Sequence, residues 1–312
     1  MTNQITYIER VLGQLTASTA GTASTQNLDL PREHLYNRLF LRLDFPTSSS
    51  ANYVANTEDL AITKIEIIAN GQLVIKSYSF LDLVNLTKYQ NAVTAVDKSA
   101  LAADKVAKWT SAIIDFSLTR KDLATLLPSY KFSSLQLKVS YDAFGTWGGD
   151  AAIPPVLTVM SRELLYTGDV KDTLFAINKE VTIGKSAAAT GYTEFDLPIG
   201  NIYRRIYCYQ QGGATAATAQ NDTTTDMEVV QDGVIYHKKI TFLMNQVKDK
   251  MEYHLETKVT GVSMLGLDST GDGGALVDSA AFSSWKLRLN VPSVANAVVL
   301  RVIPQELIYP RG

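Results

Sequence analysis

Alternating apolar and polar positions dominate the chain from Leu35 onward. Runs with period-two alternation or β-branched residues, bounded by Pro, Gly, Asn and Ser, predict strands at 35–45, 61–68, 72–79, 111–118, 133–144 and 156–166. A second group of the same character follows at 173–183, 201–210, 225–230, 234–241, 284–291 and 297–309. Six to eight strands per half with unequal connections favour two antiparallel sandwiches with Greek-key wiring.

Helical spacing is confined to short segments between these strands. Apolar residues at three- and four-residue steps predict helices at 80–89, 99–109, 120–127 and 242–255. The same steps occur near the N-terminus, at Ile5, Ile8, Leu12 and Leu15. We therefore expect residues 1–27 to form a short amphipathic helix and a linker, packed on its own domain or a neighbour. The polar face of this helix is not rich in Lys or Arg, which disfavours a helix lying on lipid.

A phrase near the start of the chain returns in the second half. Residues 28–43 read LDLPREHLYNRLFLRL, and residues 195–210 read FDLPIGNIYRRIYCYQ. Asp, Pro, Tyr and Arg recur in the same order, and the apolar positions between them keep their character. We interpret the shared Asp-Leu-Pro as a turn that fixes the start of a strand.

Three further phrases repeat in the same order. Residues 65–81 align with 227–243, and each contains a hairpin signal, Asn70-Gly71 and Asp232-Gly233, suited to a type I′ turn. The other pairs are 132–139 with 282–289 and 159–168 with 302–312. A predicted helix follows the repeated hairpin in both halves.

The repeats predict a duplicated domain. We place a first jelly roll at 28–168 and a second at 169–312, both all-β, antiparallel and eight-stranded, with short inserted helices. Eight strands fit a domain of about 140 to 160 residues when helices occupy some connections.

Composition narrows the function. The 312 residues carry a formal net charge of −2, with 46% hydrophobic and 19% charged residues, and no apolar run reaches the ~18 residues of a spanning helix. Lys and Arg are scattered, which argues against direct nucleic-acid binding. Cys208 is the only cysteine, so no intramolecular disulfide can form. The first residues lack the apolar core of a signal peptide, so we expect assembly in the cytoplasm.

The sequence contains no complete catalytic, metal-binding or phosphate-binding motif among those we tested. The three histidines, His34, His237 and His254, are isolated from one another and from carboxylate clusters. The phosphate-loop-like 182–186 has Lys179 where glycine is required, and the calcium-loop-like 268–279 ends in Ser279. There is no GxSxG element. We expect no catalytic residue, no cofactor and no metal.

Two tandem jelly rolls, each with a helix after an inner hairpin, resemble the double jelly-roll major capsid proteins of the PRD1–adenovirus lineage. In size the chain is similar to the smaller phage members of that lineage, such as those of PM2 or FLiP. The resemblance implies a homotrimer that forms a pseudo-hexagonal capsomer of a tailless icosahedral bacteriophage with an internal membrane. Expected partners are neighbouring capsomers, minor capsid or vertex proteins, and lipid beneath the shell. It would place Ile5, Ile8, Leu12 and Leu15 at the inner surface of the virion.

Two other functions remain open at this point. The fifteen tyrosines and three tryptophans could build sugar-stacking platforms in a tandem β-sandwich that binds carbohydrate, although Tyr also suits large protein interfaces. A cupin-like metal enzyme is the other alternative. Trp147, in the turn-rich segment 144–155, is the loop residue we single out as a ligand or partner contact, with local packing as its ordinary role.

Overall fold

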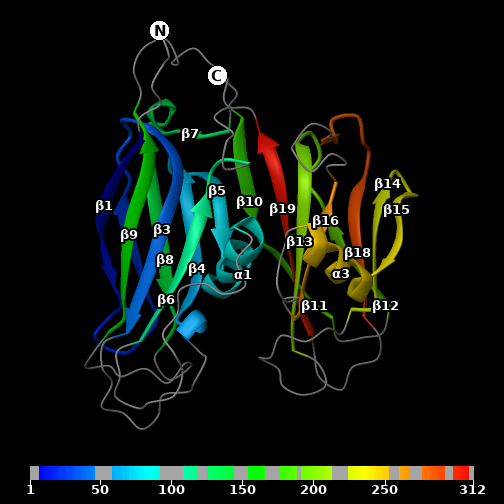
Figure 1. Ribbon diagram of the computed structural model, residues 1–312, viewed down its shortest axis with the longest axis horizontal. Helices are drawn as coiled ribbons and strands as arrows, with labels where there is room; N and C mark the ends of the chain where they lie inside the picture. Colours follow the sequence, from blue (N-terminus) through cyan, green and yellow to red (C-terminus); the bar gives the residue numbers. More distant parts are fainter. Residues whose placement is uncertain are drawn as a thin grey trace. The chain divides into compact units, whose positions relative to one another are not determined.

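The chain folds into two compact units. The computed structural model describes residues 7–45, 58–91, 108–118, 125–143, 154–165, 176–187, 191–212, 224–252, 260–267, 276–291 and 298–308 (Figure 1). Unit 1 comprises Met1–Asn178 and Tyr309–Gly312, and unit 2 comprises Lys179–Ile308. The division lies inside strand β10 (Ile177–Val181), later than the boundary after residue 168 expected from the sequence.

Within the described residues, the eight main strands of unit 1 lie in two sheets, four in each. One has the order β1-β9-β3-β6, and the other β5-β4-β8-β2. Their bounds are β1 Tyr7–Thr16, β2 Ser24–Asp29, β3 Leu35–Phe45, β4 Ile62–Ala69, β5 Leu73–Tyr78, β6 Lys108–Asp115, β8 Leu135–Tyr141 and β9 Val156–Leu164. The two-residue β7 (Leu127–Pro128) pairs with the start of β3. Helix α1 (Phe80–Asn91) and the 3-10 turns Glu58–Leu60 and Ser129–Lys131 lie in the connections.

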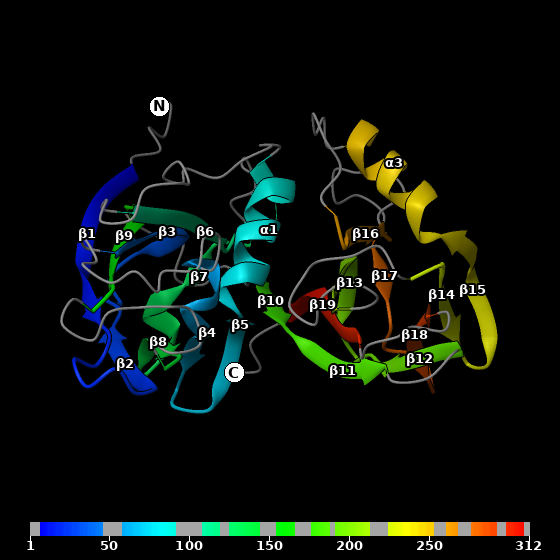
Figure 2. The same ribbon diagram turned by 90° about the horizontal axis from the view of Figure 1, so that it is seen from below.

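Unit 2 repeats this arrangement. Its sheets have the orders β16-β13-β19 with β11 on the far side of β19, and β12-β18-β14-β15. The bounds are β11 Ile183–Ala187, β12 Gly191–Asp196, β13 Ile202–Gly212, β14 Asp226–Gln231, β15 Val234–Thr241, β16 Val262–Gly266, β18 Trp285–Val291 and β19 Val298–Ile308. The short β17 (Val277–Asp278) pairs with β13, as β7 does with β3. Helix α3 (Phe242–Glu252) follows β15 (Figure 2).

The two units share one strand order. With the two-residue strands and β10 set aside, the eight main strands within the described part of each unit pair in the orders 1-8-3-6 and 2-7-4-5. This is the antiparallel wiring of a jelly roll, so the predicted fold class is confirmed. Even a β-bulge is shared, because the register shifts between Tyr36 and Arg38 in one unit and between Tyr203 and Arg205 in the other.

The repeated hairpins form as predicted. Asn70 and Gly71 have φ values of 52° and 71°, and Asp232 and Gly233 have 50° and 82°. Positive φ at both central residues is the type I′ condition, and Asn, Asp and Gly are the residues that tolerate it. The turns join β4 to β5 and β14 to β15.

The N-terminal helix predicted from the sequence is wrong. Residues 7–16 form strand β1, which pairs with β9 from Tyr7 opposite Leu164 to Thr16 opposite Val156. A β-bulge between Val11 and Gly13 reverses which residues point inward. The inward residues of β1 therefore have even numbers before the bulge, such as Ile8 and Leu12, and odd numbers after it, such as Leu15. The resulting steps of four and three residues are the same as those along one face of a helix.

The remaining helix predictions have mixed outcomes. Helices at 80–89 and 242–255 are confirmed by α1 and α3 within the described residues. The helix predicted at 99–109 is wrong at its C-terminal end, because Lys108 and Trp109 begin strand β6. Residues 99–107 lie outside the described part of the chain. Of 120–127, only 125–127 are described, and Leu127 belongs to β7.

Each sandwich is closed by apolar side chains on the inward positions of its strands. In unit 2 the buried cluster includes Phe195, Tyr203, Cys208 and Trp285, and Trp285 packs against Tyr203 and Phe282 with ring centroids 5.9 and 5.1 Å away. Burial of the three large aromatic side chains, Phe195, Tyr203 and Trp285, contributes several kcal/mol by area alone.

Candidate functional site

Three of the residues singled out from the sequence, Ile8, Leu12 and Leu15, lie in the described part of the chain. Ile5 and Trp147 lie outside the described residues. Ile8 and Leu12 are half-buried on β1, and Leu15 is buried at 5% exposure. The backbone oxygen of Leu15 accepts a hydrogen bond of 2.8 Å from the Tyr141 hydroxyl. Leu15 is thus part of the core of unit 1, and β1 is an ordinary strand of the sandwich.

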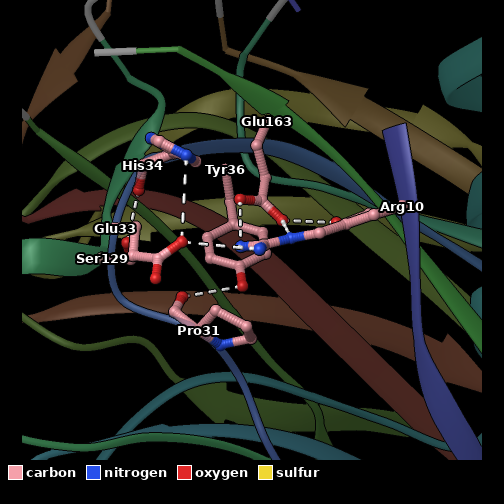
Figure 3. Close-up of polar contacts among 8 residues, drawn as sticks. Arg10, Pro31, Glu33, His34, Tyr36, Ser129 and Glu163 are labelled. Carbon is pink, nitrogen blue, oxygen red and sulfur yellow. Dashed lines mark hydrogen bonds and ion pairs between the residues drawn. The ribbon is translucent and has the colours of Figure 1, made fainter. Parts of the chain in front are cut away.

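A polar cluster at one end of unit 1 is the strongest candidate for chemistry (Figure 3). Arg10 on β1 donates through Nε and Nη2 to the two carboxylate oxygens of Glu163 on β9, at 3.0 and 2.8 Å. The Glu163 side chain is fully buried, whereas the Arg10 side chain is 33% exposed. Ser161 donates a further hydrogen bond of 2.5 Å to Glu163. The carboxylate is held by a two-point ion pair.

Tyr36 completes this cluster as a fixed hydrogen-bond donor. Its hydroxyl donates to the backbone oxygen of Pro31 at 2.8 Å, which ties the start of β3 to the Asp-Leu-Pro turn (Figure 3). Burial, with the nearby negative charge of Glu163 adding to it, raises the pKa of Tyr36 far above its ordinary value. The phenol therefore stays protonated at physiological pH and cannot serve as a base.

The serine and histidine of the cluster are not arranged as a nucleophile and its base. Ser129 donates its hydroxyl hydrogen bond to the backbone oxygen of His34, and the His34 Nε2 lies 4.0 Å from Glu33 Oε2 (Figure 3). Nucleophilic catalysis requires the hydroxyl to donate to the imidazole. The contact instead fastens the loop after β7 to the start of β3.

Unit 2 contains the same contacts at the corresponding places. Tyr203 donates to the backbone oxygen of Pro198, and Ser279 donates to the backbone oxygen of Asn201 at 2.7 Å. Glu306, opposite Tyr203 in the sheet, is buried at 1% exposure and faces Lys179 at 3.9 Å. Burial raises the pKa of Glu306, partly opposed by Lys179. We name the pairs Tyr36–Pro31 and Tyr203–Pro198 the tyrosine clamps. Because both units have one, we assign them to the fold and not to catalysis.

The hairpin tips are anchored in the same duplicated way. Asn70 Oδ1 accepts hydrogen bonds from the backbone nitrogen and hydroxyl of Ser133, at 2.7 and 3.0 Å. Asp232 Oδ1 accepts the equivalent pair from Ser283, at 2.7 and 2.6 Å, and a third from the Ser284 nitrogen at 2.8 Å. These hydrogen bonds lower the pKa of Asp232. The repeated Phe-Ser-Ser phrase is explained by this anchor.

The described ranges contain neither a cluster of metal ligands nor a membrane-spanning helix. Over residues 7–308 with the stated gaps, no three His, Cys, Asp or Glu side chains are close enough together to hold a metal ion. None of the helices in these ranges is long and apolar enough to span a bilayer.

One surface feature escaped the sequence analysis. Helix α3 presents four apolar side chains to solvent, at Leu243, Met244, Val247 and Met251. The spacing of these residues was visible in the sequence, but it predicts only that one face is apolar. It cannot say that the apolar face points away from the sandwich.

Comparison with known proteins agrees with this architecture. No family model matches the sequence, and no curated protein is significantly similar to it. Solved structures do match over almost the whole chain. The major capsid protein (MCP) of Sulfolobus turreted icosahedral virus (STIV) has a TM-score of 0.76 at 14% identity, with 98% of this chain and 97% of that one covered. This chain has the double jelly-roll fold.

Two other structures extend the likeness. The major capsid protein P2 of bacteriophage PM2 gives a TM-score of 0.66 at 13% identity, covering 98% of this chain and all of that one. The PBCV-1 virus capsid protein gives 0.69 at 9% identity, covering all of this chain and 98% of that one. At these identities the likeness establishes the double jelly-roll fold, not the activity.

Proposed function

We propose that the chain is a major capsid protein that forms the shell of a tailless icosahedral virus. The observation that carries the proposal is the pair of jelly rolls with identical strand order, combined with full-length likeness to proteins described as viral capsid proteins. A structural role also fits the buried polar clusters, because their hydrogen bonds fasten strands and loops within each unit.

The duplication also supports a homotrimer. Three copies of a chain with two similar units present six similar units around a threefold axis, so a trimer can occupy a hexagonal position in a shell. The building block is then a pseudo-hexagonal capsomer, located in the virion and associated with its own copies. A bacteriophage host and assembly in the host cytoplasm are parts of the same proposal.

An internal membrane and the minor capsid or vertex proteins, which the resemblance implies, are further parts of the proposal. Of the residues expected near the membrane, Leu15 is buried within unit 1 on strand β1, so we do not propose it as a contact with lipid. The proposal of a capsid shell does not depend on this contact.

Mass in solution and electron microscopy test the proposal together. Multi-angle scattering on the purified chain should give three times the 34.2 kDa chain mass. Micrographs at higher concentration should show hexagonal tiles, sheets or shells. A chain that remains monomeric at every concentration and forms no ordered array would refute the capsid function. Retention of that monomer on a glycan column would favour the carbohydrate-binding alternative.

A further inference from the structure

Helix α3 is amphipathic in the reverse of the usual sense. Its inward residues are mostly polar: Asn245, Gln246 and Asp249 are each buried at 1% exposure. Four of its exposed residues are apolar, with exposures of 58% for Leu243, 65% for Met244, 44% for Val247 and 74% for Met251. At about 100° per residue these four side chains occupy one stripe about 100° wide, opposite the buried face. We call this set the α3 stripe.

The polar inward face has a local cause. Strand β16 lies at the edge of its sheet and pairs with β13 alone on that side, so its other backbone groups need partners. Asn245 Nδ2 donates to the backbone oxygen of Met264 at 2.9 Å, and Gln246 Nε2 donates to that of Val262 at 2.9 Å. Asp249 Oδ2 accepts from the Met264 nitrogen at 2.8 Å. The helix thus caps the edge of β16 with side chains (Figure 2).

Capping the edge explains why polar residues point inward, but not why apolar residues point outward. The exposed side of α3 does carry the charged residues Lys248, Lys250 and Glu252, but a helix that only protected β16 would need no apolar stripe beside them. The four side chains of the α3 stripe present on the order of 400 Å² of apolar surface, a size that on monomers often marks an interaction site. A standard interface buries about 800 Å² per partner, so the stripe amounts to about half of one side.

The duplicated helix identifies the occupant. When the repeated Phe80 and Phe242 are aligned, Asp82, Asn85 and Tyr89 of α1 occupy the positions of Met244, Val247 and Met251. These three α1 residues are buried within this chain, at 0%, 1% and 2% exposure. The same face of the same helix is therefore covered in unit 1 and bare in unit 2. A ring of identical copies covers each bare face with the next copy, through a head-to-tail contact.

We propose that the α3 stripe is the surface through which one copy of this chain binds the next copy. The proposal rests on the trimer of the proposed function and names a surface for its contact. The contact is heterologous, because each α3 stripe packs on a different surface of its neighbour.

Charge substitution in the stripe is the first test. The double variant Met244→Lys/Met251→Lys should weaken trimer association by at least about 100-fold, measured as the shift in the concentration at which the trimer dissociates. Both side chains are more than half exposed, so the monomer should keep its circular dichroism spectrum. The control is Ile199→Lys, an apolar residue 45% exposed in the connection between β12 and β13 of the same unit, which should leave the trimer intact.

Thiol protection gives a second test that needs no loss of assembly. Cys208 is the only cysteine and is fully buried, so Met251→Cys introduces a single accessible thiol. This thiol should react with a maleimide at least about 10-fold more slowly in the trimer than in dilute monomer, because the next copy covers it. Ile199→Cys should react equally in both states.

The outcomes separate the two proposals. A wild-type chain that never forms trimers refutes the proposed function. A wild-type trimer in which Met251→Cys stays fully reactive refutes the α3 stripe as the contact while leaving the trimer standing. Protection of that thiol only on adding anionic phosphatidylglycerol vesicles would likewise overturn the assignment, since lipid would then be the occupant. Equal loss of trimer in the double variant and in Ile199→Lys would also overturn it.

Discussion

Removing the cation of the buried ion pair in unit 1 should cost several kcal/mol. In Arg10→Met the aliphatic stem is kept, but Glu163 loses both guanidinium hydrogen bonds, of 3.0 and 2.8 Å. The carboxylate is fully buried and keeps only the hydroxyl of Ser161. Breaking one side of a buried pair costs about 3–5 kcal/mol. Because Arg10 is 33% exposed, water can partly replace it, and we expect about 2–4 kcal/mol.

Calorimetry at neutral pH measures this loss. A domain of this size loses about 2–4 °C of Tm per kcal/mol, so the transition assigned to unit 1 should fall by about 5–15 °C. The matched control is Arg162→Met. Arg162 lies on the same strand as Glu163 and pairs with Glu9 of β1 at 2.5 Å, but both side chains are exposed, at 37% and 46%. An exposed pair contributes about 1 kcal/mol or less.

A second comparison separates the buried charge from the packing. Arg10→Met combined with Glu163→Met removes both charges, and apolar replacement of a buried pair is often neutral. The double variant should therefore be more stable than Arg10→Met alone, with a coupling measurable in a double-mutant cycle. If Arg10→Met and Arg162→Met lose equal stability, or if the double variant is the weaker, the carboxylate is not a buried charge that depends on Arg10.

Three further predictions concern single residues. Burial raises the pKa of Asp249 to about 7 from 3.8, so the native state binds this proton more tightly than the unfolded chain does. The free energy of unfolding should therefore fall between about pH 4 and pH 7, by at most about 4 kcal/mol. Urea titrations over this pH range measure the fall, and Asp249→Asn should flatten it. Asn70→Ala puts a residue that tolerates left-handed backbone less well than asparagine at φ 52°, and it removes the anchor to Ser133. Chemical denaturation should therefore show a loss of about 1–3 kcal/mol, whereas no loss would contradict the anchor. Tyr203→Phe deletes one buried clamp hydrogen bond and should cost about 1 kcal/mol, with an unchanged value showing that the hydroxyl contributes nothing.

The sequence predicts the fold well where a local rule determines the structure. Asn-Gly and Asp-Gly require positive φ in a type I′ turn, and both turns adopt it. Alternation locates β3 at Leu35–Phe45, because one face of a half-buried strand must be apolar. The shared order of the four repeated sequence segments also predicts the topology, because a duplicated sequence folds into two units with the same strand order.

Prediction fails where a long-range contact overrides the local pattern. Strand β1 looks helical in the sequence because a bulge at Val11–Gly13 interrupts its alternation, and its pairing with β9 is invisible from residues 7–16 alone. The ion pair of Arg10 with Glu163 joins two residues that lie 153 positions apart in the sequence, and no rule of sequence spacing connects them. The burial of Leu15 could not be predicted for a related reason, because it depends on the whole sandwich.

Comparison of the two units separates residues that serve the fold from residues that serve association. The tyrosine clamps and hairpin anchors agree between the units, which is expected of contacts that every jelly roll of this design requires. The helices α1 and α3 differ at equivalent positions, although both follow the same hairpin and contact corresponding strands, β6 for α1 and β16 for α3. On the helices, the aligned positions are buried in α1 and exposed in α3. We interpret this difference in exposure as a difference in what surrounds the two helices, which is why the α3 stripe, and not the shared clamps and anchors, is assigned to association.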